Sequence, residues 1–338
     1  MEARDRTKVL YIAGFGRSGS TLLGNVLGEV EGFFSVGELR QVWEYGFLGN
    51  KICGCGAPFG ECEVWRPVVD EAFGGVDGVD PREMIRLRES WARTKHIPLM
   101  LVPPGRRLVE RHLAEYLDAL GRLYEAIATV TGSRAIVDNS KFPSYGYVLG
   151  MALSVDLYVV HLVRDPRAVA YSWQRKKRLQ PDPETPEYMP RRGPAESSIR
   201  WTARNLAADA LRRRAPGARY LLLRYEDFVA KPQKAIGRVL ELVEEETASR
   251  PEVRNSNVGA HEVGAHEVDL GANHNVWGNP GRFRTGTVEI RSDTEWTYGM
   301  RLADARLVSL LTFPLLARYG YPLAVPVPGG RISETKNP

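Results

Sequence analysis

The stretch KVLYIAGFGRSGST, residues 8–21, joins a run of apolar residues to a loop rich in glycine and hydroxyl side chains. The apolar run at 8–13 predicts a buried β-strand, and the residues from Gly19 onward predict a helix. A loop between a strand and a helix N-terminus directs backbone N–H groups and the positive end of the helix at an anion. The stretch therefore predicts an α/β protein that binds a phosphate or sulfate group.

Three templates fit this loop. Its G-x-G-x-x-G spacing matches the dinucleotide-binding fingerprint, and Glu38 lies 19 residues after Gly19, near where that motif places its ribose-binding acid. The loop also matches the phosphate loop of nucleotide triphosphatases, except that Ser20 stands at the lysine position. A third template keeps the phosphate loop and takes its positive charge from Arg17. The loop by itself leaves all three open.

The composition is that of an ordinary globular protein, with 43% hydrophobic and 26% charged residues. The net charge of +5 suits an anionic ligand better than a nucleic acid, so no nucleic-acid partner is expected. No run reaches the roughly 18 consecutive apolar residues of a transmembrane helix, and the charged N-terminus lacks the apolar core of a signal peptide. We therefore expect a cytoplasmic protein without a membrane span, and the oligomeric state stays open.

Short apolar runs alternate with longer amphipathic stretches, which is the pattern of a parallel sheet with helical crossovers. The expected strands are residues 8–13, 33–36, 134–138, 157–163 and 219–224. The expected helices are residues 19–29, 107–130, 166–177, 195–213, 232–246 and 301–318. Together they predict a three-layer α/β fold in which helices flank a parallel β-sheet.

The chain shows no clear domain boundary. Residues 1–325 are expected to form a single domain, followed by a flexible tail at 326–338. Insertions are expected at about 47–130, of which 47–82 is rich in Gly, Pro and Cys and predicts irregular structure. Residues 178–194 contain five prolines and predict a mobile loop.

Two patterns resemble metal sites. Cys53, Cys55 and Cys62 lie at CxC-x6-C spacing with no fourth ligand nearby in the sequence, so a Gly-rich loop with buried or locally paired thiols is favoured over zinc. The tandem repeat VGAHE-VGAHE-V at 258–268 places two His-Glu pairs five residues apart, and a small duplication in a solvated loop is favoured there. No metal is therefore expected.

The stretch LYVVHLVRDPRAVAYSW, residues 157–173, predicts a second anion site. Arg164 follows the apolar strand at its carboxyl end, Asp165 suits a helix N-cap, and Pro166 suits the first helical position. Ser172 lies two helical turns further on and faces back toward Arg164. An arginine and a hydroxyl at this edge of the sheet, where ligands of α/β proteins bind, predict a site for one further phosphate.

Together, the segments GFGRSGSTLL, VDNSK and LVRDPRAVAYS closely resemble the sulfotransferases that use 3′-phosphoadenosine-5′-phosphosulfate (PAPS), nearest in motif to bacterial carbohydrate and tyrosylprotein types. The resemblance implies their P-loop NTPase-like fold. It also implies transfer of a sulfuryl group to a small-molecule, carbohydrate or peptide hydroxyl, giving a sulfate ester and adenosine 3′,5′-bisphosphate. The resemblance extends over 221–243 and 279–286, whereas 47–130 and 178–194 carry no match and are expected to shape the acceptor pocket.

The resemblance also implies the residues that bind the donor. The 5′-phosphosulfate would lie on the first loop, at Gly16, Arg17, Ser18, Gly19, Ser20 and Thr21. The 3′-phosphate would lie on Arg164 and Ser172. Arg282 and Arg284, in the segment GNPGRFRTG, would close over the nucleotide, with Arg282 the stronger candidate. PAPS binding by these groups needs no metal.

Lys141 and Glu38 complete the predicted site. Sulfuryl transfer, like phosphoryl transfer, spreads charge over equatorial oxygens and needs fixed cations and N–H donors aimed at them. Lys141, one of nine lysines, follows a strand and is assigned with Arg17 to the sulfuryl group or its bridging oxygen. Glu38 follows the strand at 33–36 and is assigned as general base, as in branches with a Gly-Glu after the first helix. Other branches use a histidine, whereas His161 reads as a core residue here.

Three alternatives stay open. A P-loop nucleotide kinase-like phosphotransferase would share the architecture but needs magnesium and a Walker-B aspartate, for which Asp138 is the nearest candidate. A dinucleotide-binding dehydrogenase with Glu38 on the ribose would leave Arg164 and Ser172 without a role. A non-catalytic nucleotide-binding protein would keep the pocket without the chemistry.

Overall fold

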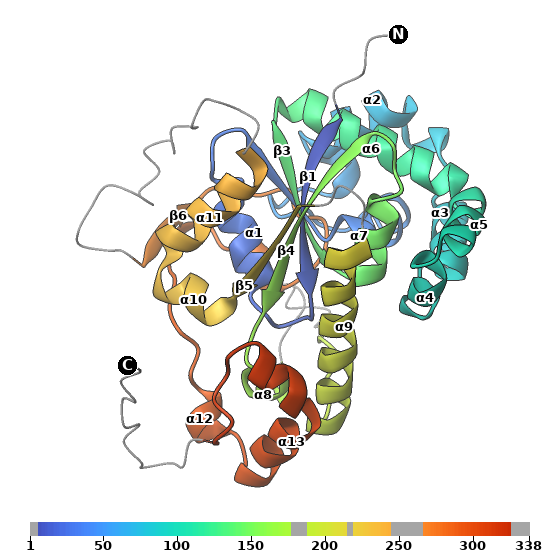
Figure 1. Ribbon diagram of the computed structural model, residues 1–338. Coiled ribbons are helices and arrows are strands. Elements are labelled where there is room, and N and C mark those ends of the chain that lie inside the picture. The colour runs from blue at the N-terminus through green and yellow to red at the C-terminus, as the bar shows by residue number, and fades with distance from the viewer. Residues whose placement is uncertain (1–5, 177–187, 215–218, 245–265, 326–338) are drawn as a thin grey trace.

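The computed structural model describes residues 6–176, 188–214, 219–244 and 266–325, and its central sheet has five parallel strands in the order β2-β3-β1-β4-β5 (Figure 1). These strands are β1 (Thr7–Gly14), β2 (Phe33–Gly37), β3 (Ala135–Lys141), β4 (Val155–Val163) and β5 (Arg219–Arg224). All five were predicted from the sequence, and the parallel sheet confirms the α/β fold class.

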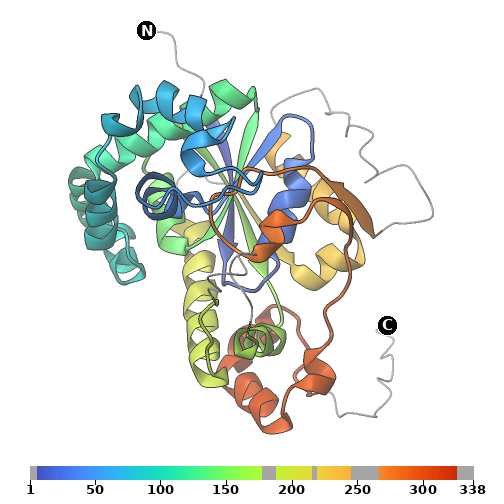
Figure 2. The same cartoon turned by 180° about the vertical axis from the view of Figure 1, so that it is seen from behind.

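Helices cover both faces of this sheet (Figures 1 and 2). Val9 and Tyr11 of β1 pack into one core with α6, α7 and α9, whereas Leu10 and Ile12 pack into the other with α1, α10 and α11. Because both faces are buried, β1 is apolar at every position from Val9 to Ala13 rather than at alternate ones. The bounds are α1 (Ser20–Gly28), α6 (Ala114–Thr131), α7 (Pro143–Leu149), α9 (Pro194–Arg214), α10 (Tyr225–Ala230) and α11 (Pro232–Glu244).

Three helices lie beyond the carboxyl ends of the strands, at the lower end of Figure 1. They are α8 (Pro166–Gln174), α12 (Trp296–Gly299) and α13 (Leu302–Arg318). Asp165 caps α8 as predicted, since its carboxylate accepts a hydrogen bond of 2.9 Å from the backbone N–H of Arg167, and Pro166 is the first helical residue. Within the described ranges, every helix is too short or too polar to cross a membrane.

The insertion between β2 and β3 is more helical than its composition suggests. It holds the turns η1 (Leu39–Gln41), η2 (Trp43–Leu48), η3 (Phe59–Glu61), η4 (Val76–Gly78) and η5 (Thr94–His96), and the helices α2 (Trp65–Phe73), α3 (Pro81–Trp91), α4 (Ile97–Met100) and α5 (Pro103–His112). The prediction of irregular structure was wrong for α2, where Val68, Val69, Ala72 and Phe73 form a buried helical stripe.

The single helix predicted at 107–130 is two helices, α5 and α6, separated at Leu113. Leu113 is fully buried, so the chain changes direction there without a glycine or proline. The change lets His112 of α5 stack on Trp91 of α3, with ring centroids 3.9 Å apart, while α6 packs on the sheet. Tertiary packing has overridden a continuous helical pattern.

A C-terminal segment returns to the sheet edge. Strands β6 (Glu267–Leu270) and β7 (Gly286–Glu289) pair antiparallel, and the chain between them includes the turn η6 (Pro280–Phe283). In Figure 2 this orange segment passes across the blue residues that follow β2, and Gly54 N–H donates to the carbonyl of Asn275 at 3.0 Å. Most of the predicted mobile loop at 178–194, most of the tandem repeat and the tail at 326–338 lie outside the described residues.

Candidate active site

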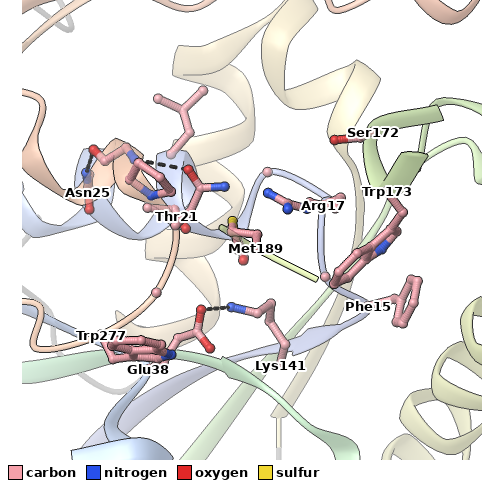
Figure 3. Close-up of a pocket in the computed structure, with 18 of the residues that line it drawn as sticks. Phe15, Arg17, Thr21, Asn25, Glu38, Lys141, Ser172, Trp173, Met189 and Trp277 are labelled. Atoms are coloured by element: carbon pink, nitrogen blue, oxygen red, sulfur yellow. Dashed lines mark hydrogen bonds and ion pairs between the residues drawn. The ribbon is translucent and has the colours of Figure 1, made fainter. Parts of the chain in front are cut away.

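A cavity of about 1,100 Å³ opens at the carboxyl ends of the strands. Its wall combines the loop after β1, the ends of β3 and β4, helix α8 and the segment around η6 (Figure 3). The predicted site residues that line it are Gly16, Arg17, Gly19, Ser20, Thr21, Glu38, Lys141, Arg164, Ser172 and Arg284. The fold thus brings together residues that are as much as 268 positions apart in the sequence.

The loop after β1 has the backbone conformation of an anion-binding turn. Gly19 is the N-cap of α1 with φ of 90°, and a Cβ there would lie 2.5 Å from the ring of Tyr225, so only glycine fits. No side chain caps the first turn of α1, which leaves its N–H groups directed at the cavity. Ser18 is buried and lies behind the cavity wall, whereas Ser20 and Thr21 line it.

Arg17 places an uncompensated positive charge in this loop. Its guanidinium is buried, and none of its three nitrogens has a hydrogen-bond partner within the described residues. The Cζ atom of the Arg17 guanidinium lies 4.9 Å from the ring centroid of Trp173. Burial lowers the pKa of Arg17 to about 10, and the nearby charge of Glu38 opposes that shift. A buried cation with five unused donors is chemically suited to an anion.

Arg17 and Lys141 also share an unusual backbone. Among the described residues, only three non-glycine residues have positive φ, and two of them are Arg17 at 72° and Lys141 at 68°. Such conformations cost about 1–3 kcal/mol each and gather at functional sites. The register of β3 against β1 is irregular beside Lys141, since Tyr11 pairs with Asp138 but Ala13 pairs with Lys141. This bulge turns the Lys141 side chain into the cavity.

Glu38 and Lys141 form an ion pair inside the cavity (Figure 3). Lys141 Nζ donates to Glu38 Oε1 at 2.6 Å, and each side chain is only 12% exposed. Gln41 donates to the other carboxylate oxygen at 3.4 Å. Glu38 follows the last residue of β2, and Lys141 is the last residue of β3, so adjacent parallel strands deliver the two groups to one place.

Arg164 and Ser172 form the second predicted anion site. Arg164 donates one hydrogen bond of 3.0 Å to the carbonyl of Arg17 and another of 2.8 Å to Asp293. Its guanidinium lies over the ring of Tyr225, and its Nε has no partner within the described ranges. Ser172 lines the same cavity from α8. Arg164 therefore both supports the first loop and presents a free donor next to it.

The structure separates the two arginines predicted to cover the nucleotide. Arg284 lines the cavity, whereas Arg282 is fully buried behind it and was the stronger candidate by sequence. Arg282 donates to the carbonyls of Gly278 and Ile52 at 3.4 and 3.3 Å. Burial lowers the pKa of Arg282 to about 10. Its position fits a residue that holds the covering segment in place.

The sequence reading missed several residues that line the cavity. Tyr45 and Trp277 stack with ring centroids 3.4 Å apart and planes 2° from parallel, and both face the cavity beside Glu38. Arg192, Arg200 and Arg204 add positive charge from around α9. A signal for the last two was present, because residues four apart on a helix share one face. The Trp277 contact joins distant segments and has no local signal.

Asp138, the candidate Walker-B aspartate, lies outside the set of residues that line the cavity. It is fully buried in β3 and accepts hydrogen bonds from the Tyr124 hydroxyl at 2.6 Å and the Ser140 N–H at 2.7 Å. Burial raises the pKa of Asp138 to about 6, although these hydrogen bonds lower it. The geometry describes a structural acid in the core.

We expect Asp138→Asn to change stability and leave nucleotide binding intact. The Asp138 carboxyl has its ordinary pKa of 3.8 in the unfolded chain and a raised pKa of about 6 in the folded chain, so folding favours its protonated form. This contribution to stability is present below pH 4 and is lost as pH rises through about 6. The free energy of unfolding of the variant relative to wild type should therefore rise by roughly 2–3 kcal/mol between pH 4 and 7. Urea titrations at several pH values measure it, with exposed Asp118→Asn as control. Loss of magnesium-dependent nucleotide binding would instead support the kinase alternative.

Comparison with known proteins agrees with this geometry. The sequence profile of the Sulfotransferase family matches residues 10–249. Similar solved structures include the sulfotransferase domain of the curacin biosynthetic pathway, with 14% identity, a TM-score of 0.47, and coverage of 95% of this chain and 100% of that one. The sulfotransferase domain of the Synechococcus PCC 7002 olefin synthase has 17% identity, a TM-score of 0.43, and coverage of 96% and 98%.

A third structure is a sulfotransferase from Mycobacterium avium, with 13% identity, a TM-score of 0.46, and coverage of 95% of this chain and 79% of that one. No curated protein matches the chain.

Proposed function

We propose that this chain, which belongs to the sulfotransferase family as its motifs predicted, transfers a sulfuryl group from PAPS to a hydroxyl acceptor. The products would be a sulfate ester and adenosine 3′,5′-bisphosphate. The observation that carries the proposal is that one cavity brings together two groups of basic and hydroxyl side chains suited to anions. Arg17 is a buried cation without a partner in the described ranges, and Arg164 with Ser172 lies next to it.

The donor would be held by both sites at once. The first loop, with Arg17, Ser20 and Thr21, would bind the 5′-phosphosulfate, because its N–H groups and guanidinium suit the oxygens of phosphate or sulfate. Arg164 and Ser172 would bind the 3′-phosphate. Arg284 would cover the nucleotide, with Arg282 supporting the covering segment. These contacts are made by side chains and backbone, so the proposal includes no metal at the donor.

The ion pair between Glu38 and Lys141 suggests how the reaction starts. A bound sulfuryl group would give Lys141 an anionic partner and free the Glu38 carboxylate for the acceptor hydroxyl. The acceptor oxygen then attacks sulfur while its proton passes to Glu38. The bond from sulfur to the 5′-phosphate oxygen breaks, and Lys141 and Arg17 stabilise the charge on the transferring group and the leaving oxygen.

The acceptor side of the cavity is basic and aromatic. Arg204 has no ion pair within the described residues, and burial lowers its pKa to about 10. Arg192 and Arg200 share the single carboxylate of Glu196. We expect hydroxyl acceptors that carry an acidic group to be preferred over neutral ones. A screen with PAPS and matched acidic and neutral phenols, sugars and peptides tests this preference.

Three alternatives stand against this proposal: a nucleotide kinase-like phosphotransferase, a non-catalytic nucleotide-binding protein and a dinucleotide-binding dehydrogenase. The buried position of Asp138 disfavours the first, because a Walker-B acid has to reach the magnesium ion. The ion-paired Glu38 and Lys141 in the cavity disfavour the second. Glu38 contacts Lys141, which also argues against the ribose contact of a dehydrogenase.

The direct test of the donor is a calorimetric titration in magnesium-free buffer. We expect adenosine 3′,5′-bisphosphate to bind about 10–100-fold more tightly than AMP, because AMP lacks the 3′-phosphate and its charge-assisted contacts. Added magnesium should change neither affinity appreciably. Equal affinity for the two nucleotides, or a strict need for magnesium, would contradict the proposal.

A further inference from the structure

Three cysteines that the proposed reaction does not use meet a histidine from the far end of the chain. Cys53, Cys55 and Cys62 lie in the turns after η2 and are all free thiols. His274 lies 212 residues beyond Cys62, in the segment between β6 and β7. The four potential ligand atoms lie within 4.8 Å of one another.

The spacing of these atoms is that of a tetrahedral metal site. The Sγ atom of Cys62 lies 3.7 Å from that of Cys55 and 3.8 Å from that of Cys53. Nδ1 of His274 lies 3.2 Å from Cys62 Sγ and 3.9 Å from Cys53 Sγ. Zinc bonds of about 2.3 Å to sulfur and about 2.0 Å to nitrogen give tetrahedron edges of about 3.8 Å between two sulfurs and about 3.5 Å between sulfur and nitrogen. A disulfide would instead bring two sulfurs to about 2.05 Å.

The surroundings hold these four groups in position. Cys53 and Cys62 are fully buried, and Cys62 Sγ also accepts hydrogen bonds from the backbone of Val64 and Trp65. The indole N–H of Trp65 donates to the carbonyl of His274 at 2.7 Å. Nε2 of His274 points to Glu63 at 3.9 Å, and a carboxylate at this place is a common outer partner of a zinc-bound imidazole.

We propose that Cys53, Cys55, Cys62 and His274 bind one zinc ion. Three thiolates and one imidazole are the ligand set of structural zinc sites, and soft sulfur ligands select zinc over magnesium or calcium. Four protein ligands leave no open position for substrate, so the ion is structural. On binding, the cysteine thiols release their protons and form bonds from sulfur to zinc, with no change in oxidation state.

The ion would fasten the covering segment to the body of the protein. His274 immediately precedes Asn275, which donates to Asn25 of α1 at 3.1 Å, and Trp277, which stacks on Tyr45. Arg282 reaches back to the carbonyl of Ile52, next to the first cysteine. Removing zinc should therefore loosen the wall of the cavity between Trp277 and Arg284, as well as the cysteine turns themselves.

The first experiment measures metal content of the full chain, purified under reducing conditions without chelator after growth with added zinc. We expect close to one zinc per chain by plasma mass spectrometry. The zinc content of the Cys62→Ser and His274→Ala variants should fall to a small fraction of that value. The His112→Ala variant, whose substitution lies outside the cluster, should retain its zinc. A folded wild-type protein with little zinc, or one with two of the three cysteines in a disulfide, overturns the proposal.

A second measurement uses only the wild-type chain, in case the variants fail to fold. Extraction of the metal and reloading with cobalt(II) should give the visible bands of a tetrahedral cobalt–thiolate centre at one cobalt per chain. Bound zinc should also protect all three cysteines from alkylation, and chelation should expose them together. Octahedral cobalt spectra, or cysteines equally reactive with and without zinc, would exclude the site.

The expected effect of zinc removal on nucleotide binding rests on the proposed function, and it is measured separately from metal content. We expect metal removal to weaken binding of adenosine 3′,5′-bisphosphate several-fold, with recovery on adding back zinc. If the protein holds zinc but binds no bisphosphate in either form, the proposed donor is wrong and the zinc site stands. If the protein binds bisphosphate but holds no zinc, the zinc site is wrong and the proposed donor stands.

Discussion

Replacing Glu38 with glutamine should lower turnover by about 10²–10⁴-fold and leave the affinity for adenosine 3′,5′-bisphosphate nearly unchanged. Glutamine has the shape of glutamate, and its amide oxygen can still accept the hydrogen bond of 2.6 Å from Lys141. It cannot take a proton from the acceptor hydroxyl. The substitution therefore removes the proposed base and retains the hydrogen bond to Lys141.

The measurement combines steady-state kinetics with PAPS and calorimetry with the bisphosphate. Glu241→Gln, the same change at an exposed position of α11, is the control and should retain full turnover. A Glu38→Gln variant that keeps most of its turnover would assign the proton to another group. If the variant instead loses bisphosphate affinity by the same factor as turnover, Glu38 positions Lys141 and the donor rather than acting as the base.

Replacing Arg164 with alanine should weaken adenosine 3′,5′-bisphosphate binding by about 2 kcal/mol or more, close to a 30-fold rise in Kd. The proposed contact with the 3′-phosphate is charge-assisted, and Ser172 alone would have to replace it. AMP has no 3′-phosphate, so its affinity should change little. Arg306→Ala, at an exposed position of α13, is the control for loss of an arginine.

The AMP titration separates two roles of Arg164. Besides lining the cavity, this side chain donates to the carbonyl of Arg17 at 3.0 Å and so supports the first loop. If that support dominates, Arg164→Ala will weaken AMP and the bisphosphate by the same factor. Such a result would mean that another cation of the cavity binds the 3′-phosphate. Arg284, which is proposed to cover the nucleotide, is the first candidate.

Much of the fold was predictable because its signals are local. Each strand of the sheet contains a short apolar run. The start of α8 is marked by two adjacent residues, the N-cap Asp165 and Pro166 at the first helical position. The loop around Arg17 is equally local, since glycine spacing, hydroxyl side chains and the preceding strand lie within 14 residues. The places of Arg164 and Ser172 in the cavity wall were also predictable, because Arg164 comes at a strand end and Ser172 on the helix that follows.

Errors arose where packing between distant segments overrode the local pattern. Helix α5 ends before Leu113, which is buried and has a non-helical backbone, and no helix-stop residue marks the place. Helix α2 forms in a stretch whose composition predicts loop, because its apolar face is covered by α6. The different places of Arg284 in the cavity wall and Arg282 behind it also have no local signal, because both residues belong to one short basic segment.

The sequence by itself determined the sheet, the strand–loop–helix unit around Arg17 and ten of the residues that line the cavity, because strand, turn and capping preferences act within a few residues. Only the tertiary structure decided which of those groups meet. It paired Glu38 with Lys141 through adjacent strand ends, set Asp293 against Arg164, and brought His274 to the three cysteines. Such contacts join segments that are 103 to 221 residues apart, and their geometry depends on the packing of the whole chain rather than on any local preference.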